Sequence, residues 1–171
     1  MLQKLLVVLN DTTIDGHIFD QALSLATANN AELILLQVLS PFDERYKNPP
    51  RQQKDGTYTI SQTRDLDYFL GYWELLKQKG VELLTSLTNK AIAKGIKAEF
   101  IQEIGDFCPQ VCQVAQIWKA DLIIIGRHGL SGVSPFLLGS VSNYLLHHTT
   151  CSVLTVQDTT PQVASVSLSS Q

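Results

Sequence analysis

Short apolar runs separated by helical patterns constrain the fold of this chain more than any other feature of its sequence. A strand-like run is a short apolar stretch bounded by polar or turn residues, and the chain has five of them: 5–9, 33–39, 122–125, 153–156 and, after Gly95, 96–101. The first three are apolar on both faces, as is typical of strands covered by helices on both sides. The run at 96–101 alternates better, so we expect it nearer an edge of the sheet.

Apolar residues at helical spacing fill the intervals between these runs. They cover 14–26, 66–91 and 111–118, and a last helix is expected to begin near Gly139 and Ser140. The resulting β-α-β-α-β-α-β-α-β order predicts an α/β fold, an open, doubly wound, Rossmann-like five-stranded parallel sheet with helices on both faces. Gly80 lies on the apolar stripe of the unusually long second helix, where we expect a close approach to the sheet or a slight kink.

Two segments stand apart from this pattern. Residues 41–65 hold three of the six prolines and five of the thirteen basic residues. A connection of this length is usually functional or disordered, so we expect a long loop that is either a floppy insertion or a lid or partner-docking arm. Residues 158–171 are rich in Ser, Thr and Gln and are expected to form a disordered tail, which leaves one domain over 1–157.

Length and charge exclude several classes of protein. A chain of 171 residues, 44% of them hydrophobic, makes one ordinary domain, and its net charge of −3 has the wrong sign for a general nucleic-acid binder. No apolar run is long enough to span a membrane, and the N-terminus lacks the features of a signal peptide. Three cysteines without a disulfide-scaffold density are typical of a reducing cytoplasm. We therefore expect a soluble cytoplasmic protein.

The segment that carries chemistry runs from Asp121 to Ser142. There a buried strand leads into a loop rich in Gly and Ser, and the loop leads into a helix. Ligands of doubly wound sheets bind beyond the carboxyl ends of the strands, glycines let the backbone approach them, and the N–H groups of a helix start favour an anion. Because Ser140 can supply a hydroxyl and an N–H, the sequence predicts a phosphate-binding loop.

The glycine spacing in this loop is specific. It matches neither the Walker A pattern nor G-x-G-x-x-G at the first strand, so a P-loop NTPase or a dehydrogenase is disfavoured. It does match Gly126-x2-Gly129-x9-Gly139-Ser140, and in this the chain resembles the ATP-binding universal stress proteins, whose pattern is G-2x-G-9x-G-(S/T). The resemblance covers about residues 2–157 and includes 7–11, 36–38, 105–106, 120–126 and 151–156. Phe107 and Ser152 stand where the family often has Pro.

The resemblance implies the strand order 3-2-1-4-5 and a site for ATP, with Mg²⁺ or Mn²⁺ held mainly by the phosphates. Asp11, with the backbone of Leu9 and Asn10, would contact the adenosine end, and Val38 would give its backbone to adenine. The other residues implied in the site are Ile125, Gly126, Arg127, His128, Gly129, Gly139, Ser140, Val141 and Ser142. For Arg127 and His128, contact with phosphate or metal-phosphate competes with a solvated loop tip.

The implied function is that of a nucleotide-dependent regulator or stress-resilience factor, homodimeric through residues 151–156 and acting on an unnamed protein partner. One alternative is slow ATP hydrolysis or nucleotidyl transfer, for which Asp11 is the only nearby carboxylate that we can nominate. Another is a partner-docking protein that uses the 41–65 loop. We expect ATP binding without efficient turnover, and we assign no catalytic residue.

Other candidate residues have plainer interpretations. Cys108 and Cys112 are four residues apart, but no further Cys or His pair completes a zinc site, so we expect small buried hydrophobes. The pair at 147–148 is expected to close the last helix near its negative end. Trp73 and Trp118 fall on apolar stripes and are expected to be core or interface anchors. No metal ligand is assigned.

Overall fold

The centre of the protein is a five-stranded parallel sheet. The computed structural model describes residues 1–9, 15–40, 51–52, 58–59, 63–126 and 135–157. The strand order is β5-β2-β1-β6-β7, which is 3-2-1-4-5 when these five strands are numbered along the chain, and it confirms the predicted fold class. The strands are β1 (Lys4–Val8), β2 (Glu32–Leu39), β5 (Ala98–Ile104), β6 (Leu122–Gly126) and β7 (Ser152–Val156).

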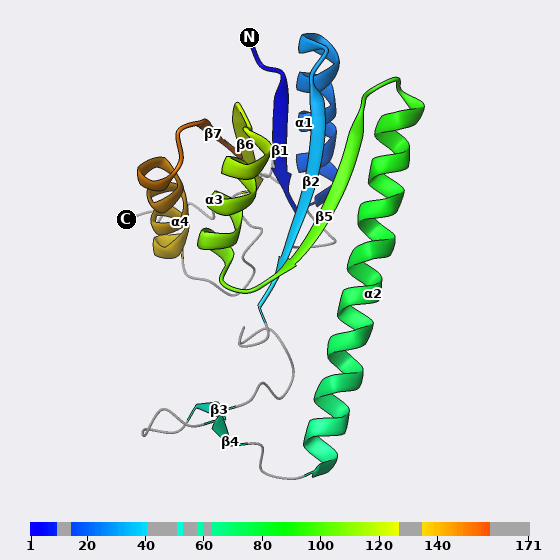
Figure 1. Ribbon diagram of the computed structural model, residues 1–171, viewed down its shortest axis with the longest axis vertical. Helices are drawn as coiled ribbons and strands as arrows, with labels where there is room; N and C mark the ends of the chain where they lie inside the picture. Colours follow the sequence, from blue (N-terminus) through cyan, green and yellow to red (C-terminus); the bar gives the residue numbers. More distant parts are fainter. Residues whose placement is uncertain (10–14, 41–50, 53–57, 60–62, 127–134, 158–171) are drawn as a thin grey trace, which may run out of the picture.

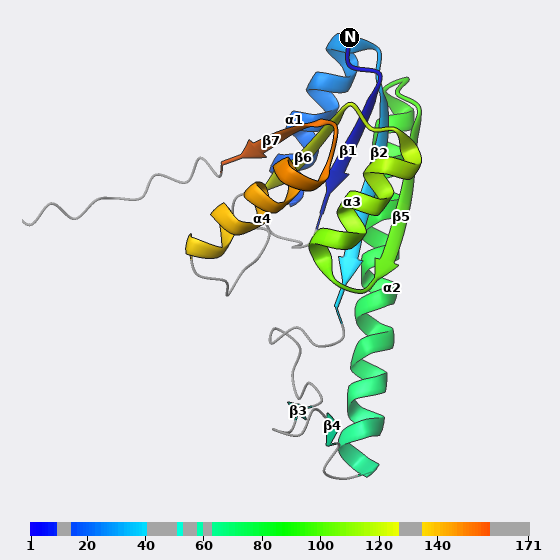
Figure 2. The same cartoon turned by 60° about the vertical axis from the view of Figure 1, so that its left-hand side comes forward.

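Helices cover both faces of the sheet (Figures 1 and 2). They are α1 (Asp15–Asn29) and α2 (Thr63–Ala93) on one face and α3 (Phe107–Trp118) and α4 (Pro135–His148) on the other. Side chains along a strand alternate between faces, so β1 sends Leu5 and Val7 into the α1–α2 cluster and Leu6 and Val8 into the α3–α4 cluster. The central strands are apolar on both faces because helices cover both faces of the sheet.

Two of the helices end on a residue in the left-handed conformation. Asn30 has φ 53°, and the N–H of Ala31 donates to Ala26 O at 2.9 Å. Lys119 also has φ 53°, and the N–H of Ala120 donates to Ala115 O at 2.9 Å. Such caps satisfy the last helical carbonyls and turn the chain sharply. The cap of α1 therefore leads directly into β2, and the cap of α3 leads into β6.

Helix α2 is much longer than the sheet that it covers. Its 31 residues span about 46 Å, whereas the seven residues of β5 span about 23 Å. The N-terminal part of α2 therefore extends past the carboxyl edge of the sheet (Figure 1). The close approach expected at Gly80 is confirmed, because a Cβ there would collide with Gln37 Oε1 and lie 2.6 Å from Gln102 Nε2.

The structure corrects three boundaries. The 41–65 segment is not loop throughout, because β3 (Arg51–Gln52) pairs antiparallel with β4 (Tyr58–Thr59) and α2 already begins at Thr63. Strand β5 begins at Ala98 and runs on to Ile104. Helix α4 begins at Pro135, earlier than expected near Gly139, since the fixed φ and missing N–H of proline suit the first helical position. The rest of the 41–62 segment and the expected tail lie outside the described residues.

Candidate functional site

The carboxyl edge of β1 and β6 is the topological switch point of the sheet. From β1 the chain moves outward through β2 to β5, and it then returns to β6 on the other side of β1 and moves outward to β7. The helices that follow these two central strands cover opposite faces, α1 after β1 and α4 after β6 (Figure 2). In doubly wound sheets the divergence of such connections opens a crevice in which ligands bind.

Four predicted site residues, Leu9, Val38, Ile125 and Gly126, come together at this edge. Val8 pairs with Leu36, Val7 pairs with Ile124, and the N–H of Leu9 donates to Leu36 O at 2.8 Å. If this register is continued, Leu9 lies level with Gly126 of β6. Val38 of β2 then lies one residue beyond the level of Leu9. The side chains of Leu9, Val38 and Ile125 are buried. These residues can therefore contribute to a ligand only through their backbone.

The backbone of Val38 is directed toward this meeting point. Residues two apart along a strand turn their N–H and C=O groups the same way. Since Leu36 faces β1, where it accepts from Leu9, the groups of Val38 also face that side, beyond the last residue of β1.

Helix dipoles turn their positive ends toward the same edge. The helices α1, α3 and α4 all follow strands, so their N-termini lie at the carboxyl edge of the sheet (Figures 1 and 2). The first turn of α4 contains no acidic residue. Helix N-termini favour anions, by about 0.3–1 kcal/mol each when exposed. The dipole at the start of α4 is therefore of the sign that a phosphate needs.

Because α4 begins at Pro135, Gly139 and Ser140 lie inside the helix and not at its start. As the fifth and sixth residues of an α-helix, they would give their N–H groups to the carbonyls four residues earlier. The helical donors without a helical partner in this conformation belong to residues 136 and 137. Val141 and Ser142 follow and are half-buried. The remaining predicted residues, Asn10, Asp11, Arg127, His128 and Gly129, lie outside the described part of the chain.

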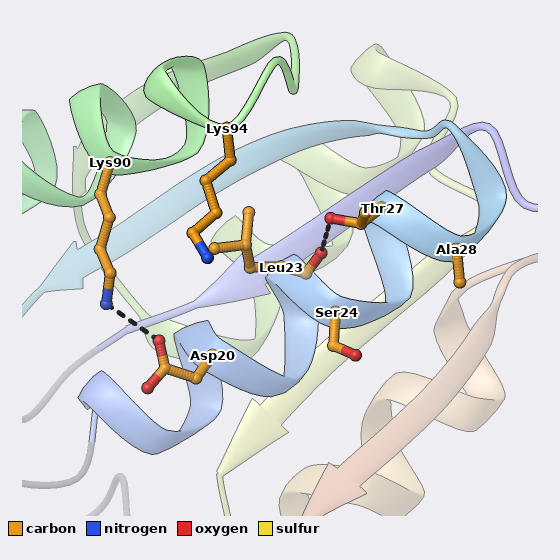
Figure 3. A pocket seen from close by; sticks show the side chains of 7 residues that line it. All are labelled: Asp20, Leu23, Ser24, Thr27, Ala28, Lys90 and Lys94. Atoms are coloured by element: carbon orange, nitrogen blue, oxygen red, sulfur yellow. Dashed lines mark hydrogen bonds and ion pairs between the residues drawn. The ribbon is translucent and has the colours of Figure 1, made fainter.

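A hollow of about 660 Å³ lies between α1 and α2, away from this edge (Figure 3). Lys90 Nζ pairs with Asp20 Oδ1 at 3.0 Å, and Lys94 reaches toward Leu23. Lys90 and Lys94 lie at the C-terminal end of α2, where the dipole is negative. The two lysines therefore complement this helix end, and the hollow is a poor site for a nucleotide phosphate.

A second hollow, of about 520 Å³, lies where α3 and α4 end and β7 begins. Asp121, one of its lining residues, accepts N–H groups from Gln3 at 2.7 Å and Lys4 at 2.9 Å, and these bonds lower the pKa of its carboxyl group. His148 Nδ1 lies 2.8 Å from Tyr144 O, and the two rings stack at 3.9 Å. The predicted place of the 147–148 pair in the last turn of a helix is confirmed.

This second hollow also brings together Cys112 and Cys151. From the sequence, Cys108 and Cys112 were weighed as metal ligands or buried hydrophobes, and Cys151 was not related to them. All three cysteines are half-buried and none is in a disulfide. Nothing in the spacing of residues 112 and 151 could have revealed the juxtaposition, because it depends on how α3 packs beside β7.

The described ranges hold neither a metal-binding group nor a membrane-spanning helix. Among these residues no three His, Cys, Asp or Glu side chains are grouped as a metal ion would require. Nor does any helix in the same ranges have the length and apolar character needed to cross a membrane.

The fold and its switch-point edge define an open, doubly wound α/β protein whose candidate ligand site lies at the carboxyl ends of β1, β2 and β6. More particularly, the chain belongs to the universal stress protein family, whose model matches residues 1–157.

Relatives in bacteria match nearly the whole chain. It is 27% identical to universal stress protein Sll1388 of Synechocystis over 154 residues, which is 90% of this chain and 97% of that protein. It is 27% identical to universal stress protein YxiE of Bacillus subtilis over 162 residues, or 92% of this chain and all of that protein.

Solved structures share the fold. Hypothetical protein MJ0577 superposes with a TM-score of 0.70 at 19% identity, over 94% of this chain and 99% of the other. A universal stress protein in complex with cAMP gives a TM-score of 0.59 at 22% identity, over 91% and 97%. An Arabidopsis thaliana family protein with AMP bound gives 0.58 at 20% identity, over 96% and 97%.

Proposed function

We propose that this protein binds ATP at the carboxyl edge of β1, β2 and β6 and acts as a nucleotide-dependent regulator or stress-resilience factor in the cytoplasm. The observation that carries the proposal is the position of Gly126. This residue opens the glycine motif, ends β6, and lies level with Leu9 at the switch point. Two similar folds that hold cAMP and AMP support an adenine nucleotide as the ligand.

The proposed roles follow the geometry of the edge. Val38 faces the side of β1, and we assign its backbone to adenine. Asp11, with the backbone of Leu9 and Asn10, is assigned to the ribose, whose hydroxyls suit an acidic residue at the end of a strand. The motif residues 126–129 and 139–142, with Ile125, are assigned to ribose and phosphates, and Mg²⁺ or Mn²⁺ would be held mainly by the phosphates. For Gly139 and Ser140 to donate their N–H groups, the first turn of α4 has to open.

Calorimetry of the purified protein with ATP, AMP, cAMP and GTP tests the proposal. We expect saturable binding of adenine nucleotides and its loss in Gly129→Val, since a branched side chain would enter the space that the motif keeps clear. Gly71→Ala is the matched control, because Gly71 is exposed on α2 with no atom within 4 Å of an added Cβ. If wild-type protein binds no adenine nucleotide, or Gly129→Val binds as well as wild type, the proposal fails.

Slow turnover is the alternative, with Asp11 as the general base. Phosphate release that Asp11→Ala abolishes while ATP affinity is kept would replace binding without turnover by catalysis. Nucleotide released from the denatured protein and identified by mass spectrometry gives a second readout, because ADP or AMP in place of ATP favours turnover.

We also propose a homodimer through β7. This strand is an edge of the sheet, and Leu154 on it is 37% exposed. An open apolar edge invites pairing with another strand. Sedimentation of a monomer at micromolar concentration would overturn this part of the proposal.

The segment 41–62 is the proposed docking element for a protein partner. It joins β2 to the part of α2 that extends past the sheet (Figure 1). Deleting it should abolish capture of a partner in pull-downs and leave ATP affinity unchanged. Loss of ATP affinity in the deletion variant would instead assign the segment to the nucleotide site.

A further inference from the structure

The three cysteines of the chain form a group at one corner of the fold. Cys108 and Cys112 are one helical turn apart on α3, and Cys151 immediately precedes β7. Cys112 and Cys151 line the same hollow and pack against the same apolar cluster of the α3–α4 face. Two thiols from distant parts of the chain therefore line one solvent-accessible depression.

The surroundings of the two thiols differ. Burial raises the pKa of Cys112, and the neighbouring charge of Cys151 raises it further. The thiolate is the form that reacts with oxidants, so burial makes Cys112 the poorer first nucleophile. Lys119, Asp121 and His148 also line the hollow.

We propose that Cys112 and Cys151 are a redox pair that closes to a disulfide in the presence of hydrogen peroxide. The sulfur of Cys151 attacks one peroxide oxygen, the O–O bond breaks, and the products are a sulfenic acid at Cys151 and one water. The sulfur of Cys112 then attacks the sulfur of Cys151, its S–O bond breaks, and a second water leaves with the thiol proton. Two thiols are oxidised by two electrons, and one peroxide is reduced to two waters.

The bond would join α3 to the start of β7. That strand pairs with β6 on one side only among the described strands, so a covalent link to α3 adds a second attachment. Closing the chain between 112 and 151 also restricts the unfolded ensemble, which raises stability in the chain-entropy account of disulfides. This inference is independent of nucleotide binding.

Peptide mapping of the intact chain tests the assignment. The reduced protein is treated with a small excess of hydrogen peroxide, free thiols are blocked with iodoacetamide, and the protein is digested without reductant for mass spectrometry. We expect a peptide pair linked through Cys112 and Cys151, two hydrogen atoms lighter than the sum of its parts and released by dithiothreitol. The thermal unfolding midpoint of the oxidised protein should rise by several degrees.

Single variants separate the possible outcomes. Cys108→Ser should keep both the linked peptide and the rise in midpoint, whereas Cys112→Ser and Cys151→Ser should lose both. A link between Cys108 and Cys112, a Cys151–Cys151 link between two chains, or full alkylation of Cys112 and Cys151 after peroxide would each overturn the proposal. So would oxidation of Cys151 to the sulfinic acid without any linked peptide.

Discussion

Gln102 Nε2 donates a hydrogen bond of 2.8 Å to Gln37 Oε1 and another of 2.9 Å to Lys77 O, beneath Gly80. The two glutamines are register partners on β2 and β5, and Gln37 is only 8% exposed. The amide pair therefore ties two strands to the backbone of α2 where the sheet ends and the helix continues. Residue 80 lies on the apolar stripe of α2, and it is a glycine because the two amides occupy the space that a side chain would fill.

Gly80→Ala is predicted to destabilise the protein. In an exposed helix this change stabilises by about 1 kcal/mol, but here the new Cβ would collide with Gln37 Oε1 and displace a buried hydrogen-bonded pair. Leaving such groups unpaired costs about 1–3 kcal/mol. Urea unfolding should show a net loss of stability of up to about 2 kcal/mol, whereas Gly71→Ala, which meets open space, should gain about 1 kcal/mol.

A double-mutant cycle identifies the cause of this loss. In a Gln37→Ala background the nearest obstruction is gone, so adding Gly80→Ala should cost much less than it does in wild type. Equal costs in the two backgrounds would show that the amide pair is not what keeps residue 80 a glycine.

Thr88→Val is predicted to stabilise the protein. The Thr88 side chain is 7% exposed on α2, and its hydroxyl has no hydrogen-bond partner in the described part of the structure. Replacing it with a methyl group of similar size removes a buried unpaired polar group, a gain of about 1 kcal/mol. Thr88→Ser keeps the hydroxyl and loses a buried methyl, so its urea midpoint should fall. A lower midpoint for Thr88→Val would indicate that the hydroxyl is hydrogen-bonded in solution.

Asp121→Asn is predicted to alter the acid sensitivity of folding. Two N–H groups hold the pKa of Asp121 below its ordinary value, so the ionised carboxylate stabilises the folded state above about pH 4, and this contribution is lost as the pH falls through the folded-state pKa. At pH 7 the variant should be less stable than wild type by about 1 kcal/mol. The loss is small because Asp121 is half-exposed. Urea unfolding between pH 3 and pH 7 should show the difference shrinking below about pH 4.

Asp67→Asn is the control for this experiment. Asp67 is exposed in α2, so this variant makes the same change of side chain at an exposed position. A difference between Asp121→Asn and wild type that stays constant down to pH 3 would contradict the assigned role of Asp121.

Thr155→Pro is predicted to weaken the proposed dimer while leaving the fold intact. The N–H of Ser152 donates to Asp121 O, so even-numbered residues of β7 turn their N–H toward β6 and Thr155 turns its N–H outward. Proline there removes a donor only from the open edge. Leu154→Pro removes a donor to β6 instead and should destabilise the monomer. Sedimentation and thermal unfolding compare the two, and a Thr155→Pro dimer as tight as wild type would place the interface elsewhere.

Local pattern was enough to predict most of the fold. Buried parallel strands are short and apolar on both faces, helices repeat at 3.6 residues, and right-handed crossovers leave few ways to connect them. The strand order was taken from the family resemblance and is confirmed. The start of α4 could not be derived in this way, because residues 135–138 are acceptable both to a loop and to a first helical turn, and only the helix of the folded chain decides between them.

The sequence by itself determined the alternation of strands and helices, the edge of the sheet that carries the glycine motif, and the position of Gly80 on an apolar stripe. These are properties of periodicity and spacing, which neighbouring residues set. Only the tertiary structure decided that Gln37 and Gln102 meet beneath Gly80, and that Cys112 and Cys151 share one hollow. Such contacts depend on strand register and helix packing, which bring together residues that no local pattern relates.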